Sequence, residues 1–119
     1  MKILVTGAAG FIGYNLCKSL VKDKFQVLGI DNLNNYYDKN LKLSRLKELR
    51  KISNKKKNYR FFKVDICNSR KLKNLFKKYK FKTILHFAAQ AGIRFSLKKP
   101  EEYVKSNLSG FFNILDLSK

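Results

Sequence analysis

The chain has 119 residues, 45% of them hydrophobic, and its 27 Lys and Arg against 8 Asp and Glu give a formal net charge of +19. This size and composition exclude a disordered chain, and we expect residues 1–119 to form a single domain. No apolar run approaches the ~20 residues of a membrane span, and the first apolar residues break at once into a glycine turn, so we expect neither a signal peptide nor a location outside the cytoplasm.

The high positive charge has two interpretations. Clustered cations bind the phosphates of nucleic acids, whereas scattered lysines make a solvated surface that attracts anions without specificity. Here the lysines are spread over nearly every segment, and their densest run, Lys55–Lys57, lies in a polar stretch predicted to be a loop. This distribution favours the solvated surface and no specific nucleic-acid partner. Cys17 and Cys67 are predicted to be reduced, and one histidine without a C-x-x-C pattern predicts no metal site.

The first predicted strand, Lys2–Thr6, runs into a turn with glycines at positions 7, 10 and 13, and a helix is predicted from Phe11 to Lys22. A strand, a glycine turn and a helix N-terminus in this order can hold a phosphate on backbone N–H groups. The spacing is G-x-x-G-x-x-G, which differs from the strict G-x-G-x-x-G pattern. A tight connection without a ligand is therefore the alternative.

The second predicted strand, Phe25–Ile30, ends on Asp31. Asp31 lies 18 positions after Gly13, close to the ~20 residues that separate the glycine turn of a dinucleotide site from the acid that binds the adenosine ribose. A 2′-phosphate would meet its negative charge, so the residue favours NAD over NADP; capping of a turn is the alternative. A polar and aromatic loop over 32–38 follows, and then apolar residues at helical spacing: Leu41, Leu43, Leu46, Leu49 and Ile52.

The second half continues the alternation. Predicted strands cover Arg60–Val64, followed by Asp65 and Ile66, and Lys82–Phe87, followed by a small-residue turn over 88–92. Asn68 or Ser69 can cap the helix between them, and Pro100 suits the first turn of a last helix. The predicted buried face of that last helix comprises Val104, Leu108, Phe111 and Leu115.

Strands and helices that alternate in this way predict an α/β fold, the N-terminal part of a Rossmann-type doubly wound parallel sheet. The strand ends carrying Gly7, Asp31, Asp65 and Ala88 would then meet at the carboxyl edge of the sheet, where such folds bind ligands.

Several motifs together resemble the extended short-chain dehydrogenase/reductase family of NAD-dependent sugar-nucleotide epimerases and dehydratases. They are Thr6–Gly13, Asp31–Leu33, Asp65–Ile66 and His86–Ala89. Two longer stretches, Asp31–Leu43 and Ala88–Ser96, are similar to the UDP-glucuronate 4-epimerase group. The resemblance implies NAD as cofactor and C4 inversion of a UDP-sugar, through a 4-keto intermediate, by a longer parent enzyme that is commonly a homodimer.

The resemblance also implies roles for individual residues. The pyrophosphate region of the cofactor would be contacted by Gly7, Gly10, Phe11, Ile12 and Gly13. The adenosine ribose would be held by Asp31 and Asn32, and the adenine pocket would be lined by Asp65 and Ile66. The nicotinamide side would be lined by Ala88, Ala89 and Gln90. Arg94 and Ser96 would lie near the sugar nucleotide, with Arg94 able to pair with a uronate carboxylate. Asn107 would lie near the active site. A surface position for Arg94 and a structural hydrogen bond for Asn107 are the alternatives, and His86 is interpreted as a packed strand residue.

The catalytic tyrosine of the family lies in a Tyr-x-x-x-Lys motif. The two literal matches, Tyr14–Lys18 and Tyr59–Lys63, fit poorly, because the first lies on the helix of the phosphate turn and the second runs into a strand, where side chains four apart do not meet. We therefore expect the family's catalytic motif and its substrate-binding portion beyond Lys119, no catalytic residue within this chain, and no turnover by the chain alone. A stand-alone NAD-binding module, or another epimerase or dehydratase of the same family, is the alternative.

Overall fold

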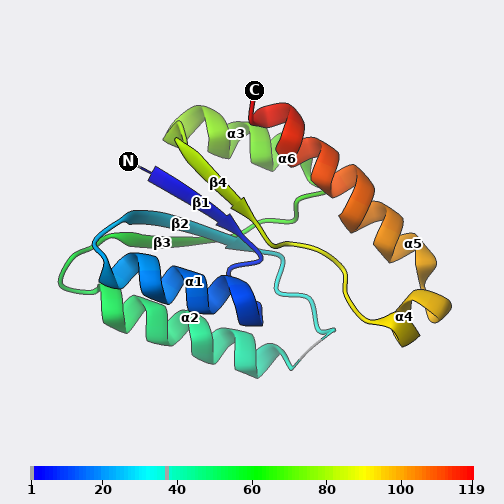
Figure 1. Ribbon diagram of the computed structural model, residues 1–119, viewed down its shortest axis with the longest axis horizontal. Coiled ribbons are helices and arrows are strands. Elements are labelled where there is room, and N and C mark those ends of the chain that lie inside the picture. Colours follow the sequence, from blue (N-terminus) through cyan, green and yellow to red (C-terminus); the bar gives the residue numbers. More distant parts are fainter. Residues whose placement is uncertain (1, 37) are drawn as a thin grey trace.

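The computed structural model describes residues 2–36 and 38–119; Tyr37, in the predicted loop 32–38, lies outside them. Within this part a parallel sheet has the strand order β3-β2-β1-β4, as Figure 1 shows. The strands are β1 (Lys2–Thr6), β2 (Gln26–Asp31), β3 (Tyr59–Lys63) and β4 (Thr83–His86). The parallel pairings of β1 with β2 and β4, and of β2 with β3, confirm the predicted α/β fold.

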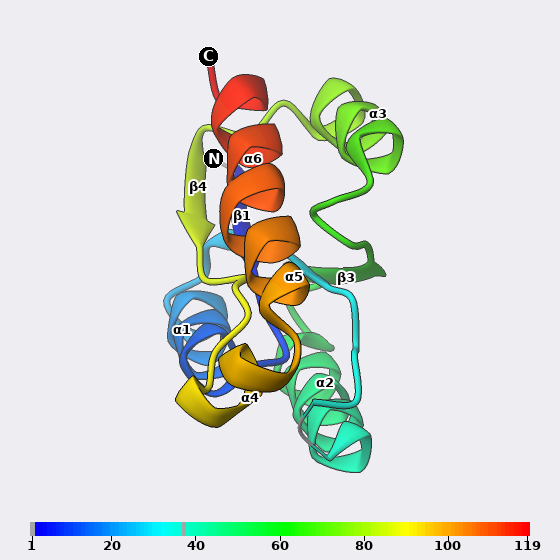
Figure 2. The same ribbon diagram turned by 90° about the vertical axis from the view of Figure 1, so that its right-hand side faces the viewer.

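Helices cover both faces of this sheet (Figures 1 and 2). Two of them, α1 (Phe11–Lys22) and α2 (Lys39–Ser53), pack side by side on one face. The other face carries α3 (Ser69–Tyr79) and, beside it, α6 (Phe111–Leu117). Of the two predicted caps of α3, Asn68 or Ser69, the structure has Asn68, whose side-chain oxygen accepts a hydrogen bond from the Lys71 N–H at 3.0 Å.

Alternate residues of the strands build two cores, one on each face. Ile3, Val5 and Val27 pack with Cys17 and Leu49 beneath α1 and α2. On the opposite face, Leu4, Leu28 and Ile30 pack with Leu72 and Ile114 beneath α3 and α6. The central strand β1 is thus buried on both faces, as expected for a parallel strand, whereas all four residues of the edge strand β4 are partly exposed.

A last helical stretch follows the turn after β4. It comprises α4 (Ile93–Lys98), α5 (Pro100–Tyr103), the π-helical segment η1 (Val104–Gly110) and α6. The prediction of its buried face was wrong: Gly110 and Ile114 are buried, whereas exposed side chains occupy every predicted position, with Val104 at 55%, Leu108 at 64%, Phe111 at 46% and Leu115 at 54%. The face that packs on the core is the neighbouring one, where Gly110 lies against Ile66 and Ile114 joins the core beneath α3 and α6.

The apolar pattern predicted over residues 41–52 was also partly wrong. On α2, Leu41 and Leu43 are about half exposed and Lys42 lies between them at 5% exposure. The buried Lys42 forms an ion pair with Asp31 of β2, so this part of α2 packs through a lysine and not through its leucines. Among the described helices, none combines the length and the apolar character that crossing a membrane requires.

Candidate functional site

A cavity of about 450 Å³ lies at the carboxyl edge of the sheet, where the four strands end. The glycine turn after β1, the end of β2, the segment after β3 and the turn after β4 all contribute to its wall. Every residue that the sequence predicted for cofactor binding belongs to the lining: Gly7, Gly10, Phe11, Ile12, Gly13, Asp31, Asn32, Asp65, Ile66, Ala88, Ala89 and Gln90.

The glycine turn depends on close backbone contacts. Gly7 has a positive φ of 68°, and a Cβ atom there would lie 2.8 Å from the backbone of Phe87 and Ala88. A Cβ atom on Gly13 would lie 2.1 Å from the Gly7 carbonyl oxygen. Both positions exclude any larger residue without a shift of the backbone, since the contacting atoms cannot rotate away.

The N-terminus of α1 borders the cavity. Gly10 is its N-cap and supplies no side-chain cap, and its first turn contains no acidic residue. The first amides of a helix have no partner within the helix, and the helix dipole makes this end positive. This end of α1 can therefore hold an anion such as a pyrophosphate.

Asp31 is fixed at the end of β2 and is only 6% exposed. Its Oδ2 accepts a hydrogen bond from the Ala9 N–H at 3.2 Å, and its Oδ1 accepts one from the Leu33 N–H at 2.8 Å. The carboxylate is thereby tied to the glycine turn, and it faces the cavity that it lines.

Two cations of α2 line the same cavity, and sequence reasoning missed both. Lys42 forms a buried ion pair with Asp31, Nζ to Oδ1 at 3.2 Å. Arg45 donates a hydrogen bond to the Ala9 carbonyl at 3.0 Å and lies 5.7 Å from the centre of the Tyr14 ring. Their spacing of three residues, with an acid at the end of the preceding strand, is the signal that could have indicated them.

Asn107 holds the turn after β4 in place. Its side chain accepts a hydrogen bond from the Gln90 N–H at 2.8 Å and donates one to the Gln90 carbonyl at 3.1 Å. This is the structural role that sequence analysis left open as the alternative, and Asn107 is not part of the cavity lining.

The other two predicted substrate residues lie on α4, outside the cavity lining. Arg94 is exposed, and the Ser96 hydroxyl donates a hydrogen bond to the Ile93 carbonyl. The structure thus separates Arg94 and Ser96 from the residues predicted for the cofactor, and their role in substrate binding stays a prediction.

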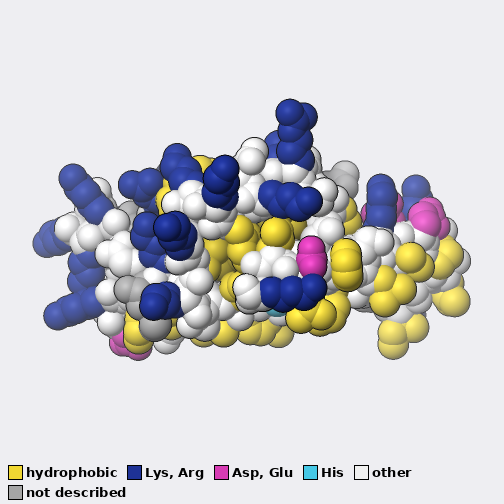
Figure 3. Space-filling model, turned by 90° about the horizontal axis from the view of Figure 1, so that it is seen from above, with side chains coloured by type: hydrophobic (Ala, Val, Ile, Leu, Met, Phe, Trp, Pro, Cys, Tyr) yellow, Lys and Arg dark blue, Asp and Glu magenta, His cyan; other side chains and the backbone are white. Residues whose placement is uncertain are grey.

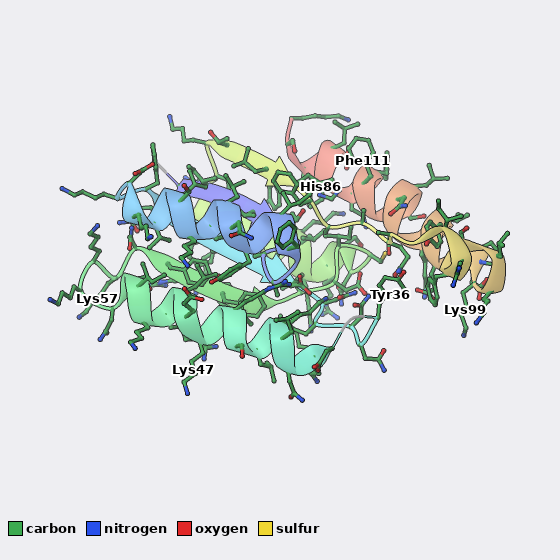
Figure 4. All side chains as sticks on the ribbon, turned by 60° about the horizontal axis from the view of Figure 1, so that its bottom comes forward. Tyr36, Lys47, Lys57, His86, Lys99 and Phe111 are labelled. Atoms are coloured by element: carbon green, nitrogen blue, oxygen red, sulfur yellow. The ribbon has the colours of Figure 1, made fainter. Side chains whose placement is uncertain are left out.

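His86, at the end of β4, forms a hydrogen bond with Thr6 of the neighbouring strand β1. The Thr6 Oγ1 accepts hydrogen bonds from the N–H groups of Phe87 and Ala88, both at 3.0 Å. Its own proton is then free to be donated to His86 Nδ1, 2.7 Å away. Burial lowers the pKa of His86, and its ring packs beside Phe111 (Figure 4). This is the packed strand residue that the sequence predicted.

The two Tyr-x-x-x-Lys matches lie outside the cavity lining. Tyr14 and Lys18 both bind the Glu48 carboxylate of α2, with 2.6 Å between Lys18 Nζ and Glu48 Oε1. Tyr59 is 8% exposed in the core beneath α1 and α2, where burial raises the pKa of its hydroxyl far above the usual value. Neither tyrosine is placed to act on a ligand in the cavity.

The C-terminal end of the chain adds no further group to the cavity. Lys119 follows α6, and its exposed Nζ lies 2.9 Å from Asp116 Oδ1, outside the cavity lining. The expected catalytic motif and substrate-binding portion beyond Lys119 therefore stay a prediction.

Neither of the free cysteines belongs to the cavity lining. Cys17 is fully buried, and burial raises the pKa of its thiol to about 12. Cys67 donates a hydrogen bond to the Lys105 carbonyl, and burial raises the pKa of its thiol to about 11. Their raised pKa values make both thiols poor nucleophiles, and both cysteines are free, as predicted.

Comparison with known proteins places this geometry among sugar-nucleotide enzymes. Residues 4–119 match the family model described as GDP-mannose 4,6 dehydratase. The chain is 47% identical over 116 residues to UDP-glucuronate 4-epimerase of Thermodesulfobacterium geofontis, covering 98% of this chain and 35% of that protein. It is 43% identical to Protein CapI of Staphylococcus aureus, covering 100% of this chain and 34% of the relative. The chain therefore spans about a third of the length of these relatives.

Solved structures agree with the sequence relatives. A mutant UDP-glucuronic acid 4-epimerase from Bacillus cereus, in complex with UDP-4-deoxy-4-fluoro-glucuronic acid and NAD, superposes with a TM-score of 0.85 at 35% identity, over 98% of this chain and 36% of that one. UDP-glucose 4-epimerase of Thermus thermophilus in complex with NAD gives a TM-score of 0.77 at 29% identity, over 98% of this chain and 33% of that one.

Proposed function

From the premise that this chain belongs to the GDP-mannose 4,6 dehydratase family of NAD-dependent epimerases and dehydratases, we propose that it is the NAD-binding part of a UDP-glucuronate 4-epimerase. Its sequence relatives include a UDP-glucuronate 4-epimerase, and a structural neighbour of the same activity is a complex with NAD. The proposed parent enzyme is a cytoplasmic homodimer that inverts C4 of a UDP-uronate, with its catalytic tyrosine beyond Lys119.

The observation that carries the proposal is the meeting of a glycine turn, a helix N-terminus and a buried carboxylate around one cavity. The N-terminus of α1 suits the pyrophosphate, Asp31 suits the adenosine ribose, and Asp65 with Ile66 suits the adenine. The absence of a Cβ atom at Gly7, Gly10 and Gly13 keeps the turn tight and its backbone close to the ligand. These residues fit a dinucleotide.

NAD bound here would take the hydride from C4 of the sugar and return it to the other face. This chain's residues would hold the cofactor for that reaction. Ala88, Ala89 and Gln90 line the cavity after β4, where the nicotinamide would lie, and Asn107 fixes the backbone of Gln90. Arg94 and Ser96 are proposed to reach the sugar nucleotide, with Arg94 pairing with its carboxylate.

We expect the 119-residue chain alone to be inactive. Tyr14 and Tyr59, its two tyrosines in Tyr-x-x-x-Lys spacing, lie outside the cavity lining, so neither can take a proton from a sugar hydroxyl held beside the nicotinamide. Measurable epimerisation of UDP-glucuronate by the purified chain would contradict this expectation.

The proposal is tested by calorimetric titration of the purified chain with NAD, with NADP and with NAD at raised salt. We expect saturable NAD binding that is tighter than NADP binding and that persists at high ionic strength. Circular dichroism is the control for folding. A folded chain that binds no NAD, or binds it only at low salt through its general positive charge, would overturn the proposal.

A further inference from the structure

Lys42 is a buried cation in the wall of the cavity. It is 5% exposed, although lysine is rarely buried unless it is paired. Its Nζ donates to Asp31 Oδ1 and to Asn34 Oδ1, both at 3.2 Å. An ammonium group carries three protons, so these two bonds leave one proton for a ligand in the cavity that Lys42 lines.

The carboxylate of Asp31 is largely occupied by the protein itself. A carboxylate has about four acceptor sites, two on each oxygen. Oδ1 already accepts from Leu33 and Lys42, whereas Oδ2 accepts from Ala9 alone among the described residues. Asp31 therefore has room for one ribose hydroxyl, and the remaining proton of Lys42 is available for the oxygen of the other.

The ion pair also changes the charge that a 2′-phosphate would meet. Asp31 and Lys42 together are neutral, and Arg45 adds a positive charge one helical turn away on the same wall. The charge of Asp31 alone therefore does not describe how this pocket would discriminate between NAD and NADP. A phosphate beside the ribose would lie close to an acid and two cations at once.

We propose that Lys42 determines the coenzyme specificity of this pocket together with Asp31. It donates to a ribose hydroxyl of NAD, and by neutralising Asp31 it weakens the exclusion of the 2′-phosphate of NADP. The proposal rests on the function proposed above, since it concerns the ribose end of the same site.

The test is a set of dissociation constants for NAD and NADP at one ionic strength, measured on the wild-type chain and on four variants. In Lys42→Met, we expect NAD to bind about tenfold more weakly, as for a lost hydrogen bond to a charged group, and NADP to lose more. In Asp31→Asn, the ratio of the NADP to the NAD constant should fall by about tenfold or more, because Lys42 and Arg45 then face the phosphate unopposed. The double variant should lose that gain.

Lys47→Met is the matched control, because Lys47 lies exposed on the outer side of the same helix and its loss removes the same charge (Figure 4). Its two constants should equal those of the wild type. The proposal is overturned if Lys42→Met leaves the ratio of the two constants where Lys47→Met leaves it. If Lys42→Met does not fold, Lys42→Gln, which keeps a hydrogen-bond donor but removes the charge, decides, and a ratio equal to that of Lys47→Met overturns the proposal. A folded wild-type chain that binds no NAD overturns the proposed function itself, which distinguishes the two failures.

Discussion

Thr6 and His86 show how a single hydroxyl fixes the protonation of a neighbouring ring. Two backbone N–H groups fill the acceptor sites of Thr6 Oγ1, so its proton goes to His86 Nδ1 and the ring must accept there. A protonated His86 would carry a proton at Nδ1 and lose this bond. Burial also disfavours the charged form of the ring, and it therefore lowers the pKa of His86.

Stability should consequently depend on pH through His86. The pKa is lower in the folded state than in the unfolded chain, so the unfolded chain binds more protons, and the free energy of unfolding falls as pH drops through about 6.5 toward the folded pKa. Urea unfolding between about pH 7.5 and 5 measures this loss. His86→Asn should show a flatter profile, and identical slopes for the two proteins would contradict the assignment.

Gly13 and Gly10 should separate the fold of the glycine turn from its use. Gly13→Ala places a Cβ atom 2.1 Å from the Gly7 carbonyl, and we expect a loss of about 3 kcal/mol in the free energy of unfolding. Gly10→Ala meets the same carbonyl at 3.2 Å, so it should unfold nearly as the wild type does yet bind NAD more weakly. Chemical denaturation and NAD titration of both variants make the test. Equal losses of stability in the two variants would contradict this separation, because Gly10 would then be needed for the fold of the turn as Gly13 is.

Individual residues of the site could be predicted where the backbone dictates the residue type. Gly7 follows β1 and Asp31 ends β2, and the meeting of these strand ends follows from the alternation of strands and helices. Lys42 was missed, because a lysine between two leucines has the pattern of a solvent-facing residue and the weaker signal of its spacing from Arg45 was not used. Only the position of Asp31, a partner in another element, makes its burial favourable.

At the scale of the element, one helix secures the turn that follows β4. Asn107, in η1, exchanges two hydrogen bonds with the backbone of Gln90. The Asn107 side chain pairs with both the N–H and the C=O of Gln90, as the backbone of a neighbouring strand would. It thereby fixes a segment that has no secondary structure of its own.

Replacing Asn107 by alanine should therefore loosen the turn without unfolding the sheet. We expect a loss of about 1 kcal/mol in stability, as for a hydrogen bond that water can replace, and faster proteolysis within residues 88–92. Limited proteolysis with and without NAD measures the change. Ser109→Ala, at an exposed position of the same segment, is the control and should be cut at the wild-type rate.

The same segment explains where the pattern of the sequence fails. Residues Val104–Gly110 form a π-helix, and the last helical stretch packs on the core with Gly110 and Ile114, one position before the predicted Phe111 and Leu115. The residues from Ile93 to Lys98 were likewise given no helix in advance, and they form α4 without burying a single residue. Periodicity identifies a helix by the face it buries, so it has no signal for α4.

For the whole molecule, the exposed hydrophobic surface favours association between copies of the chain, whereas the positive net charge opposes it. Figure 3 shows hydrophobic side chains gathered at the end that carries α4 and α5, while Lys and Arg stand out over the rest of this face. Ile93 is 87% and Leu97 82% exposed there, and the exposed positions of η1 and α6 extend the apolar surface. A net charge of +19 keeps copies of the chain apart at low ionic strength.

Raising the salt should therefore promote self-association. At about 1 M salt the Debye length is only ~3 Å, so the repulsion is screened while the apolar surface remains. Sedimentation velocity at low and high salt measures the change in mass. The double variant Leu108→Glu, Leu115→Glu should stay monomeric at both, since both side chains are more than half exposed and their loss spares the core. A wild-type chain that stays monomeric in high salt would contradict this expectation.

The strand order has a consequence for synthesis on the ribosome. β1 pairs with β2 across one short helix, but its other neighbour is β4, and Thr6 and His86 are 80 positions apart in the chain. A ribosome that has released only the first three strands has made the glycine turn and Asp31 but not the opposite wall, since the peptide after β4 closes the cavity behind Gly7. Loop closure over this distance is slow compared with the local pairings. The nascent chain therefore completes its ligand pocket only after β4 has been made, and a coenzyme would select chains that have already paired β4 with β1.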